Sequence, residues 1–108
     1  MILNQESQME IVISKHGAPI RLTEERWFHI TEEHSEMAGY YYDVLETIQE
    51  PGAIYEGKEG ELLATKEIEP EKYIVVVYKE IDKTDGFVIT AFLTKRIKQV
   101  ERRIKLWP

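Results

Sequence analysis

Five consecutive residues, Ile74 to Tyr78, belong to the β-branched and aromatic types that favour extended backbone. They predict a strand from Tyr73 to Ile81, because the run lies between polar segments with turn residues. We expect this strand to be central in a β-sheet.

Further strands are predicted wherever apolar and β-branched residues dominate a short segment. They are Met9–Ser14, Ala53–Glu56, Leu62–Ile68 and Phe87–Thr94. The loops at residues 57–60 and 82–86 are short and polar and contain glycine, which is typical of hairpins. The strands from Ala53 onward should therefore form an antiparallel meander.

Two helices are predicted before the meander. Thr23 is a suitable N-cap, and Glu24 and Glu25 fall in the first turn, where the helix dipole favours negative charge. This helix should run from about Glu24 to His34. A second helix should span Tyr41–Gln49 and stop at the Pro51-Gly52 pair that follows it.

These elements predict an α+β fold in which two N-terminal helices pack on a four- to five-stranded antiparallel β-meander. We expect a single domain over residues 1–108, because a chain of this length with 43% hydrophobic residues can bury one core. Residues 1–20 would supply a strand and a turn. Residues 97–108 form a basic C-terminal segment that is either a helix or an extended arm.

Composition excludes several classes of protein. The chain has no cysteine, so disulfides, thiolate nucleophiles and sulfur-ligated zinc are ruled out. No apolar run reaches the roughly 18 residues of a membrane span, and the first ten residues lack the pattern of a signal peptide. We therefore expect a cytoplasmic protein without membrane contact.

Charge is distributed unevenly along the chain. The formal net charge is −6, yet residues 95–108 contain six basic residues and one acid, a local charge of +5. An acidic protein ordinarily has little affinity for a phosphate backbone. The basic segment is either a solvated face or a surface that attracts a polyanion.

Two of the three histidines, His29 and His34, lie five residues apart on the first predicted helix. At 100° per residue their side chains are rotated by about 140° from each other, so they do not share one stripe. His34 falls on the side of Trp27, facing the core or a cleft beneath it. Zinc signatures on helices place their histidines four apart, so we expect no metal and no cofactor.

Strand periodicity assigns two more polar residues to faces of the sheet. On Phe87–Thr94, alternation places Thr90 and Thr94 on one face together with Val88 and Phe92. That face is the less apolar of the two and should be partly open. On Leu62–Ile68, Lys66 shares a face with apolar residues, where it either reaches the edge of the sheet or is placed for a function.

The two histidines, Lys66 and the threonines form a set of side chains that suits cleavage of RNA without a metal. The 2′-hydroxyl must lose a proton, the leaving 5′-oxygen must gain one, and the charge on phosphorus needs donors or cations nearby. Histidine, with an unperturbed pKa near ~6.5, can perform either proton transfer at neutral pH.

The order of motifs resembles the barnase/EndoU/colicin/RelE-like nuclease superfamily, in particular its phage-associated domains of unknown function. The resemblance covers about residues 21–96. Its matching pieces are Trp27-Phe28-His29-Ile30 with His34 and Glu36, Ile48-Gln49-Glu50-Pro51 before Ile54-Tyr55, Lys66, Val75-Val76-Val77-Tyr78, and Val88-Ile89-Thr90-Ala91-Phe92. Ser35 and Gly52 depart from it, where proline and an acid are more usual.

The resemblance implies a small metal-independent endoribonuclease acting on RNA, for example on one transfer RNA. It implies catalytic roles for His29, His34, Lys66 and Thr90. His34 would be general base or acid, His29 its partner or a phosphate contact, Lys66 the stabiliser of charge and Thr90 a hydrogen-bond donor. Substrate contacts would come from Tyr78, Thr94, Lys95 and Arg96.

A toxin of a toxin-antitoxin or phage-defence system would have this activity, and its partner would be an antitoxin or immunity protein. The alternative is a non-catalytic protein- or RNA-binding module on the same scaffold. The enzyme requires the two histidines and Lys66 to converge on one phosphate, whereas the binding module does not.

Overall fold

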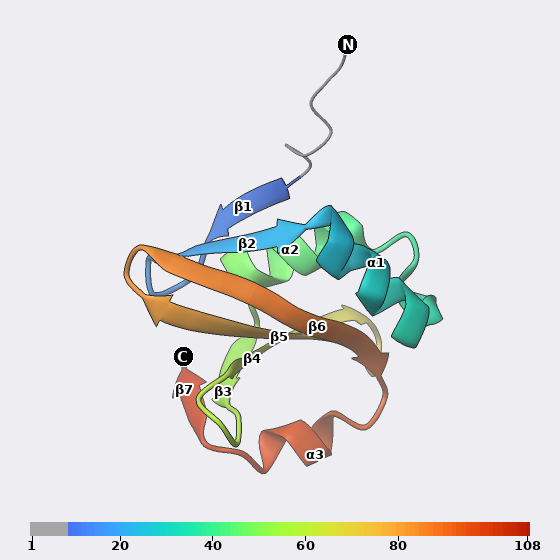
Figure 1. The fold of residues 1–108 in the computed structure, drawn as a ribbon. Coiled ribbons are helices and arrows are strands. Elements are labelled where there is room, and N and C mark those ends of the chain that lie inside the picture. The colour runs from blue at the N-terminus through green and yellow to red at the C-terminus, as the bar shows by residue number, and fades with distance from the viewer. Residues whose placement is uncertain (1–8) are drawn as a thin grey trace.

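A computed structural model describes residues 9–108, which form one mixed sheet of seven strands (Figure 1). The strand order across the sheet is β1-β2-β6-β5-β4-β3-β7. The strands are β1 (Met9–Ile13), β2 (Pro19–Thr23), β3 (Ala53–Glu56), β4 (Leu62–Glu69), β5 (Lys72–Asp82), β6 (Asp85–Thr94) and β7 (Lys105–Trp107). All neighbouring strands are antiparallel except β2 and β6, which are parallel where Arg21 pairs with Phe87.

The helices are short and occur at two points of the chain, after β2 and after β6. They are α1 (Glu24–Glu33), the 3-10 turn η2 (Ser35–Met37), α2 (Tyr41–Gln49) and α3 (Ile97–Glu101). The Thr23 side chain accepts a hydrogen bond from the backbone N–H of Arg26 at 3.0 Å, which confirms the predicted N-cap. No helix within residues 9–108 is long and apolar enough to cross a membrane.

The predicted fold class was wrong in its arrangement. Two strands precede α1, so the chain does not begin with two helices, and the sheet has seven strands rather than four or five. β2 was overlooked because residues 16–19 read as a turn and the strand beyond them is short. β7 has three residues, too few for a periodic signal, and the C-terminal segment, expected to be either a helix or an extended arm, contains both a helix and a strand.

The meander itself was predicted correctly. Strands β3, β4, β5 and β6 follow one another in space as well as in sequence, and each pair is antiparallel. The bounds of α2 and β3 agree with the prediction at both ends. This agreement reflects clear signals, namely one apolar helix face, the Pro51-Gly52 stop and polar hairpin loops.

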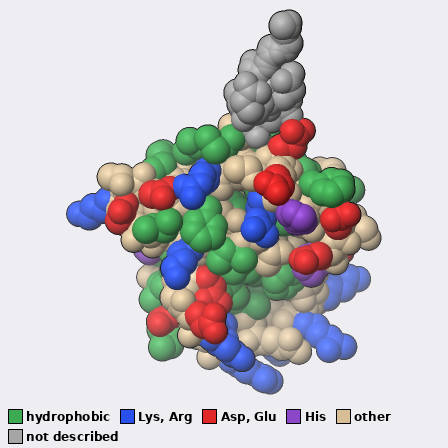
Figure 2. Space-filling view, in the orientation of Figure 1, with side chains coloured by type: hydrophobic (Ala, Val, Ile, Leu, Met, Phe, Trp, Pro, Cys, Tyr) green, Lys and Arg blue, Asp and Glu red, His purple; other side chains and the backbone are tan. Residues whose placement is uncertain are grey.

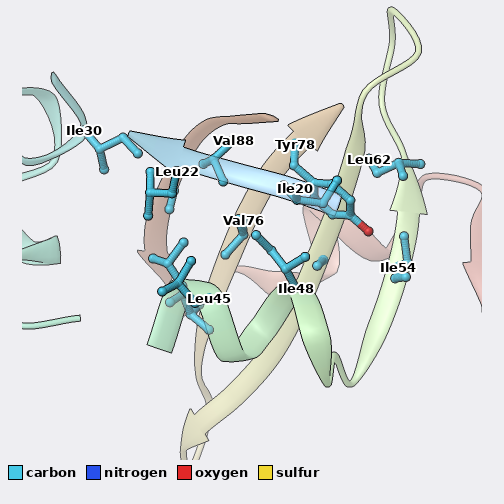
Figure 3. Packing of buried hydrophobic residues seen from close by; sticks show 14 of the residues in the cluster. Ile20, Leu22, Ile30, Leu45, Ile48, Ile54, Leu62, Val76, Tyr78 and Val88 are labelled. Atoms are coloured by element: carbon cyan, nitrogen blue, oxygen red, sulfur yellow. The ribbon is translucent and has the colours of Figure 1, made fainter. Parts of the chain in front are cut away.

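Hydrophobic side chains cover both faces of the sheet. The larger cluster lies on the face toward α1 and α2, which we call the α2 face (Figure 3). A smaller cluster of Ala53, Tyr55, Val75 and Val100 lies on the opposite face under α3, which we call the α3 face. The larger cluster contains Ala18, Ile20, Leu22, Ile30, Met37, Val44, Leu45, Ile48, Ile54, Leu62, Ala64, Ile74, Val76, Tyr78, Val88 and Ala91.

A bulge in β6 changes which side chains reach each face. Val77 pairs with Thr90 but Tyr78 pairs with Val88, so β6 has one extra residue at this point. Val88 therefore joins Ala91 in the core on the α2 face, while Thr90 remains on the α3 face. The predicted grouping of Val88 with Thr90 was wrong, because simple alternation does not survive an inserted residue.

Gly86 lies where β2 and β6 meet, and its substitution tests this crossing. A Cβ at Gly86 would lie 2.5 Å from Ile20 Cδ1 and 2.6 Å from the Lys79 carbonyl oxygen. Gly86→Ala should therefore lower the free energy of unfolding by about 1–3 kcal/mol, measured by urea denaturation. At Gly57 a Cβ would meet only the flexible Glu61 side chain, so Gly57→Ala should cost less. Equal costs at both sites would contradict this account.

The Tyr78 hydroxyl is buried without a hydrogen-bond partner within the described chain, and Figure 3 shows its oxygen in the hydrophobic cluster. Tyr78→Phe removes a polar group that gains nothing from folding. At pH 8 the free energy of unfolding of the variant should therefore equal that of wild type or exceed it by up to about 1 kcal/mol. Urea denaturation measures this difference.

Burial, followed by the Glu80 carboxylate, raises the pKa of the Tyr78 hydroxyl. The folded state therefore holds this proton more tightly than the unfolded chain, in which tyrosine titrates near about pH 10. The stability linked to Tyr78 is present below that pH and is lost as the pH rises above it. Tyr78→Phe should consequently lose less stability than wild type between about pH 9 and pH 11; equal losses would exclude a contribution from Tyr78.

Candidate functional site

His34 ends α1 and carries its imidazole to β6. Its backbone N–H donates to the Ile30 carbonyl oxygen at 2.7 Å, which closes the helix before η2 begins. The imidazole and the Phe92 ring have centroids 5.8 Å apart, and the His34 side chain is 35% exposed. The Nδ1 atom lies 3.7 Å from a carboxylate oxygen of Glu36. His34 is thus a solvent-accessible base or acid beside β6.

Thr90 lies two residues before Phe92 on the same strand and on the same α3 face. Its hydroxyl is buried and has no hydrogen-bond partner in the part of the chain that the structure describes. A buried hydroxyl without a partner costs stability, so its retention needs a reason. Because of the bulge, Thr90 lies on the same face as Phe92, the residue that His34 contacts.

Thr94, Lys95 and Arg96 follow at the end of β6. Thr94 pairs with Tyr73 of β5, and its hydroxyl accepts a hydrogen bond from the Arg96 N–H at 2.8 Å. Beyond it lies a hollow of about 480 Å³ between the sheet and α3. Lys and Arg side chains project at the α3 end of the molecule (Figure 2). The lining residues are Glu71, Tyr73, Lys95, Arg96, Ile97, Lys98, Gln99 and Arg102.

The other predicted site residues lie elsewhere. Lys66 pairs with Ile74, a core residue of the α2 face, and its ammonium lies 3.7 Å from the Glu46 carboxylate of α2. His29 is half exposed on α1, within 4.0 Å of Glu25 and 3.8 Å of Glu32.

Tyr78 belongs to the buried cluster of the α2 face. The structure therefore brings His34 and Thr90 to one face, with Thr94, Lys95 and Arg96 farther along. It places Lys66 and Tyr78 on the opposite face of the sheet.

Two aromatic residues of the site were not singled out from the sequence. Phe92 and Tyr73 were read only as strand residues, yet Phe92 contacts His34 and Tyr73 lines the hollow at α3. Alternation along β5 does place Tyr73 opposite the buried Ile74 side chain. The contact with α3 depended on a segment whose structure the sequence left open.

Metal binding receives no support from the geometry of residues 9–108. Within this range, no three or more His, Asp or Glu side chains gather in a way that could hold a metal ion. Comparison with protein-family models, curated proteins and solved structures found no match to this chain. The resemblance to the nuclease superfamily therefore remains a prediction from the sequence motifs.

The unpartnered Thr90 hydroxyl gives a test of stability that is independent of activity. Thr90→Val keeps the shape of the side chain and removes the hydroxyl, so the free energy of unfolding should stay the same or rise by up to about 1 kcal/mol. The Ser14 hydroxyl, in contrast, donates to Glu80 at 2.5 Å and accepts from the Ala18 N–H at 3.2 Å. Ser14→Ala should cost about 1–3 kcal/mol in the same urea titration, and a similar loss for Thr90→Val would show a hidden partner.

Proposed function

We propose that this protein is a small metal-independent endoribonuclease that binds RNA on the α3 face of its sheet. The observation that carries the proposal is the partly exposed His34 imidazole beside Phe92, on the face where the Thr90 hydroxyl has no partner within residues 9–108. A proton-transfer group and a hydrogen-bond donor thus lie near one edge of one face. The cations Lys95 and Arg96 follow on the same strand end.

The reaction follows from the chemistry of RNA. His34 takes the proton of a 2′-hydroxyl while its oxygen attacks the adjacent phosphorus, and the bond from phosphorus to the 5′-oxygen breaks. The products are a 2′,3′-cyclic phosphate and a 5′-hydroxyl. The Thr90 residue is only partly buried, so rotation of its side chain would bring the inward-turned hydroxyl to a phosphate oxygen, to which it donates as negative charge develops there. The leaving oxygen receives its proton from water, a step that requires no second histidine at the site.

A second candidate function, a non-catalytic RNA-binding module, is favoured by the position of Lys66. This lysine pairs with Glu46 on the α2 face, so it does not join His34 as the resemblance implied. A binding module needs the face and its cations but no convergence of catalytic groups. We retain the cytoplasm as the proposed location and an antitoxin or immunity protein as the proposed partner of an active enzyme.

Cleavage of total RNA by the purified protein in EDTA tests the enzyme. Wild type should cleave, and His34→Gln should lower the rate by at least about 100-fold because the proton transfer is lost. Thr90→Val should lower it by about tenfold or more, because one donor to the phosphate is removed. Labelled transfer and ribosomal RNA on denaturing gels give the rates.

His29→Gln and Lys66→Met are the matched controls. His29 is an imidazole and Lys66 a cation, and both lie away from the His34 site. Each should retain the rate of wild type within a few-fold. Absence of cleavage by folded wild type would favour the binding module. A loss in His29→Gln equal to that in His34→Gln would contradict the assignment of proton transfer to His34 alone.

A further inference from the structure

The hollow beside α3 combines cations with an aromatic ring, and the proposed function uses only Lys95 and Arg96 from its lining. Lys95, Arg96, Lys98 and Arg102 line it together with Tyr73. A second hollow of about 440 Å³ shares Gln99 and Arg102 with the first and adds Arg103. Glu71 lines the first hollow and Glu56 the second, so basic side chains outnumber acidic ones in both linings.

Within the part of the chain that the structure describes, the four cations of the first hollow form no ion pairs. Among residues 9–108, neither Lys95, Arg96, Lys98 nor Arg102 lies within ion-pair distance of a carboxylate. Among the Lys and Arg side chains of residues 9–108, only Lys15, Arg21 and Lys66 pair with carboxylates, so what distinguishes these four cations is that they line one hollow. Arg103, by comparison, already has a partner, because its side chain donates a hydrogen bond to the Glu56 carbonyl oxygen at 2.6 Å. Unpaired cations gathered around one hollow fit an external anion.

Tyr73 indicates where a base and where a phosphate would lie. Desolvation raises the pKa of the Tyr73 hydroxyl, and so do the carboxylates of Glu67, Glu101 and Glu71. The surroundings of that hydroxyl are therefore negatively charged. A phosphate would be repelled there and attracted by Lys98 and Arg102. The Tyr73 ring is therefore better suited to stack against an uncharged base, which requires an unpaired nucleotide.

The spacing along β6 connects this hollow with the His34 site. Tyr73 pairs with Thr94, which lies two residues beyond Phe92 on the α3 face. Two residues of a strand span about 7 Å, a distance that one extended nucleotide can bridge. A single strand with one phosphate at His34 would thus place a neighbouring nucleotide at Tyr73.

We propose that the hollow lined by Tyr73, Lys98 and Arg102 is a subsite for single-stranded RNA, which holds the nucleotide next to the one cleaved at His34. This inference rests on the proposed function for its choice of RNA as ligand. The ring of Tyr73 stacks on the base, and the cations of the α3 segment neutralise the phosphates.

Fluorescence anisotropy with a labelled, 2′-O-methylated oligonucleotide of about ten residues tests the subsite, because this probe binds but cannot be cleaved. Lys98→Gln/Arg102→Gln should weaken binding at least tenfold at about 50 mM salt and reduce the slope of log affinity against log salt by about 1.4. Tyr73→Leu should weaken binding at least fivefold, whereas Tyr73→Phe keeps the ring and should bind as wild type.

Lys79→Gln/Lys83→Gln is the control for charge, because it removes two cations near the β5–β6 hairpin, far along β5 from Tyr73. It should change affinity less than threefold. The subsite is overturned if this control weakens binding as much as Lys98→Gln/Arg102→Gln, if Tyr73→Leu binds as wild type, or if duplex RNA binds as tightly as the single strand. Tighter binding of an oligoglutamate peptide than of the oligonucleotide would assign the hollow to a protein partner and would also overturn it.

Binding and cleavage can fail separately. Oligonucleotide binding that depends on Tyr73 and Arg102, without cleavage of any RNA, would support the subsite and reject the nuclease. Cleavage that depends on His34, with binding unaffected by the hollow, would support the nuclease and reject the subsite.

Discussion

The antiparallel pairing of β5 with β6 is the interaction on which the rest of the structure depends. β5 buries Ile74 and Val76 against the helices and Val75 under α3, so it supplies hydrophobic contacts to both layers. β6 joins it on one side and carries the bulge that separates Val88 from Thr90. Without that inserted residue Val88 and Thr90 would share a face, so Val88 could not be in the core of the α2 face while Thr90 and Phe92 lie on the α3 face.

The local elements could be read from the sequence because their signals are contained within short segments. Thr23 caps α1, Pro51-Gly52 ends α2, and the strand of Ile74–Tyr78 is unmistakable. β2 and β7 could not be read in this way. β2 pairs with the neighbouring β1 but follows a segment that reads as a turn, and β7 has only three residues, held by the distant Ile54. Alternation along β4 predicted that Lys66 shares a face with apolar residues. The sequence did not show that His34 reaches the opposite face, so the separation of Lys66 from His34 could not be predicted.

Charge separation explains how an acidic protein can offer a basic surface. The cations of residues 95–103 are carried on one short segment after β6, whereas the acids of residues 9–94 are spread over the strands, the helices before β3 and the loops. Over distances beyond about 10 Å, salt screens these acids from a ligand at α3. Nearby acids still matter, and those around the Tyr73 hydroxyl divide the hollow into a side suited to a base and a side suited to phosphate.

The pairing of β7 with β3 fixes the α3 segment at both ends, since β6 precedes it and β7 follows it. Val100 also packs into the cluster with Ala53 and Tyr55. The backbone that carries the cations is therefore ordered before any ligand arrives. A flexible basic tail would lose conformational entropy on binding RNA, whereas here most of that cost has already been met in folding. Affinity at this surface is thus linked to the stability of the distant edge of the sheet, where three residues of β7 hold the segment in place.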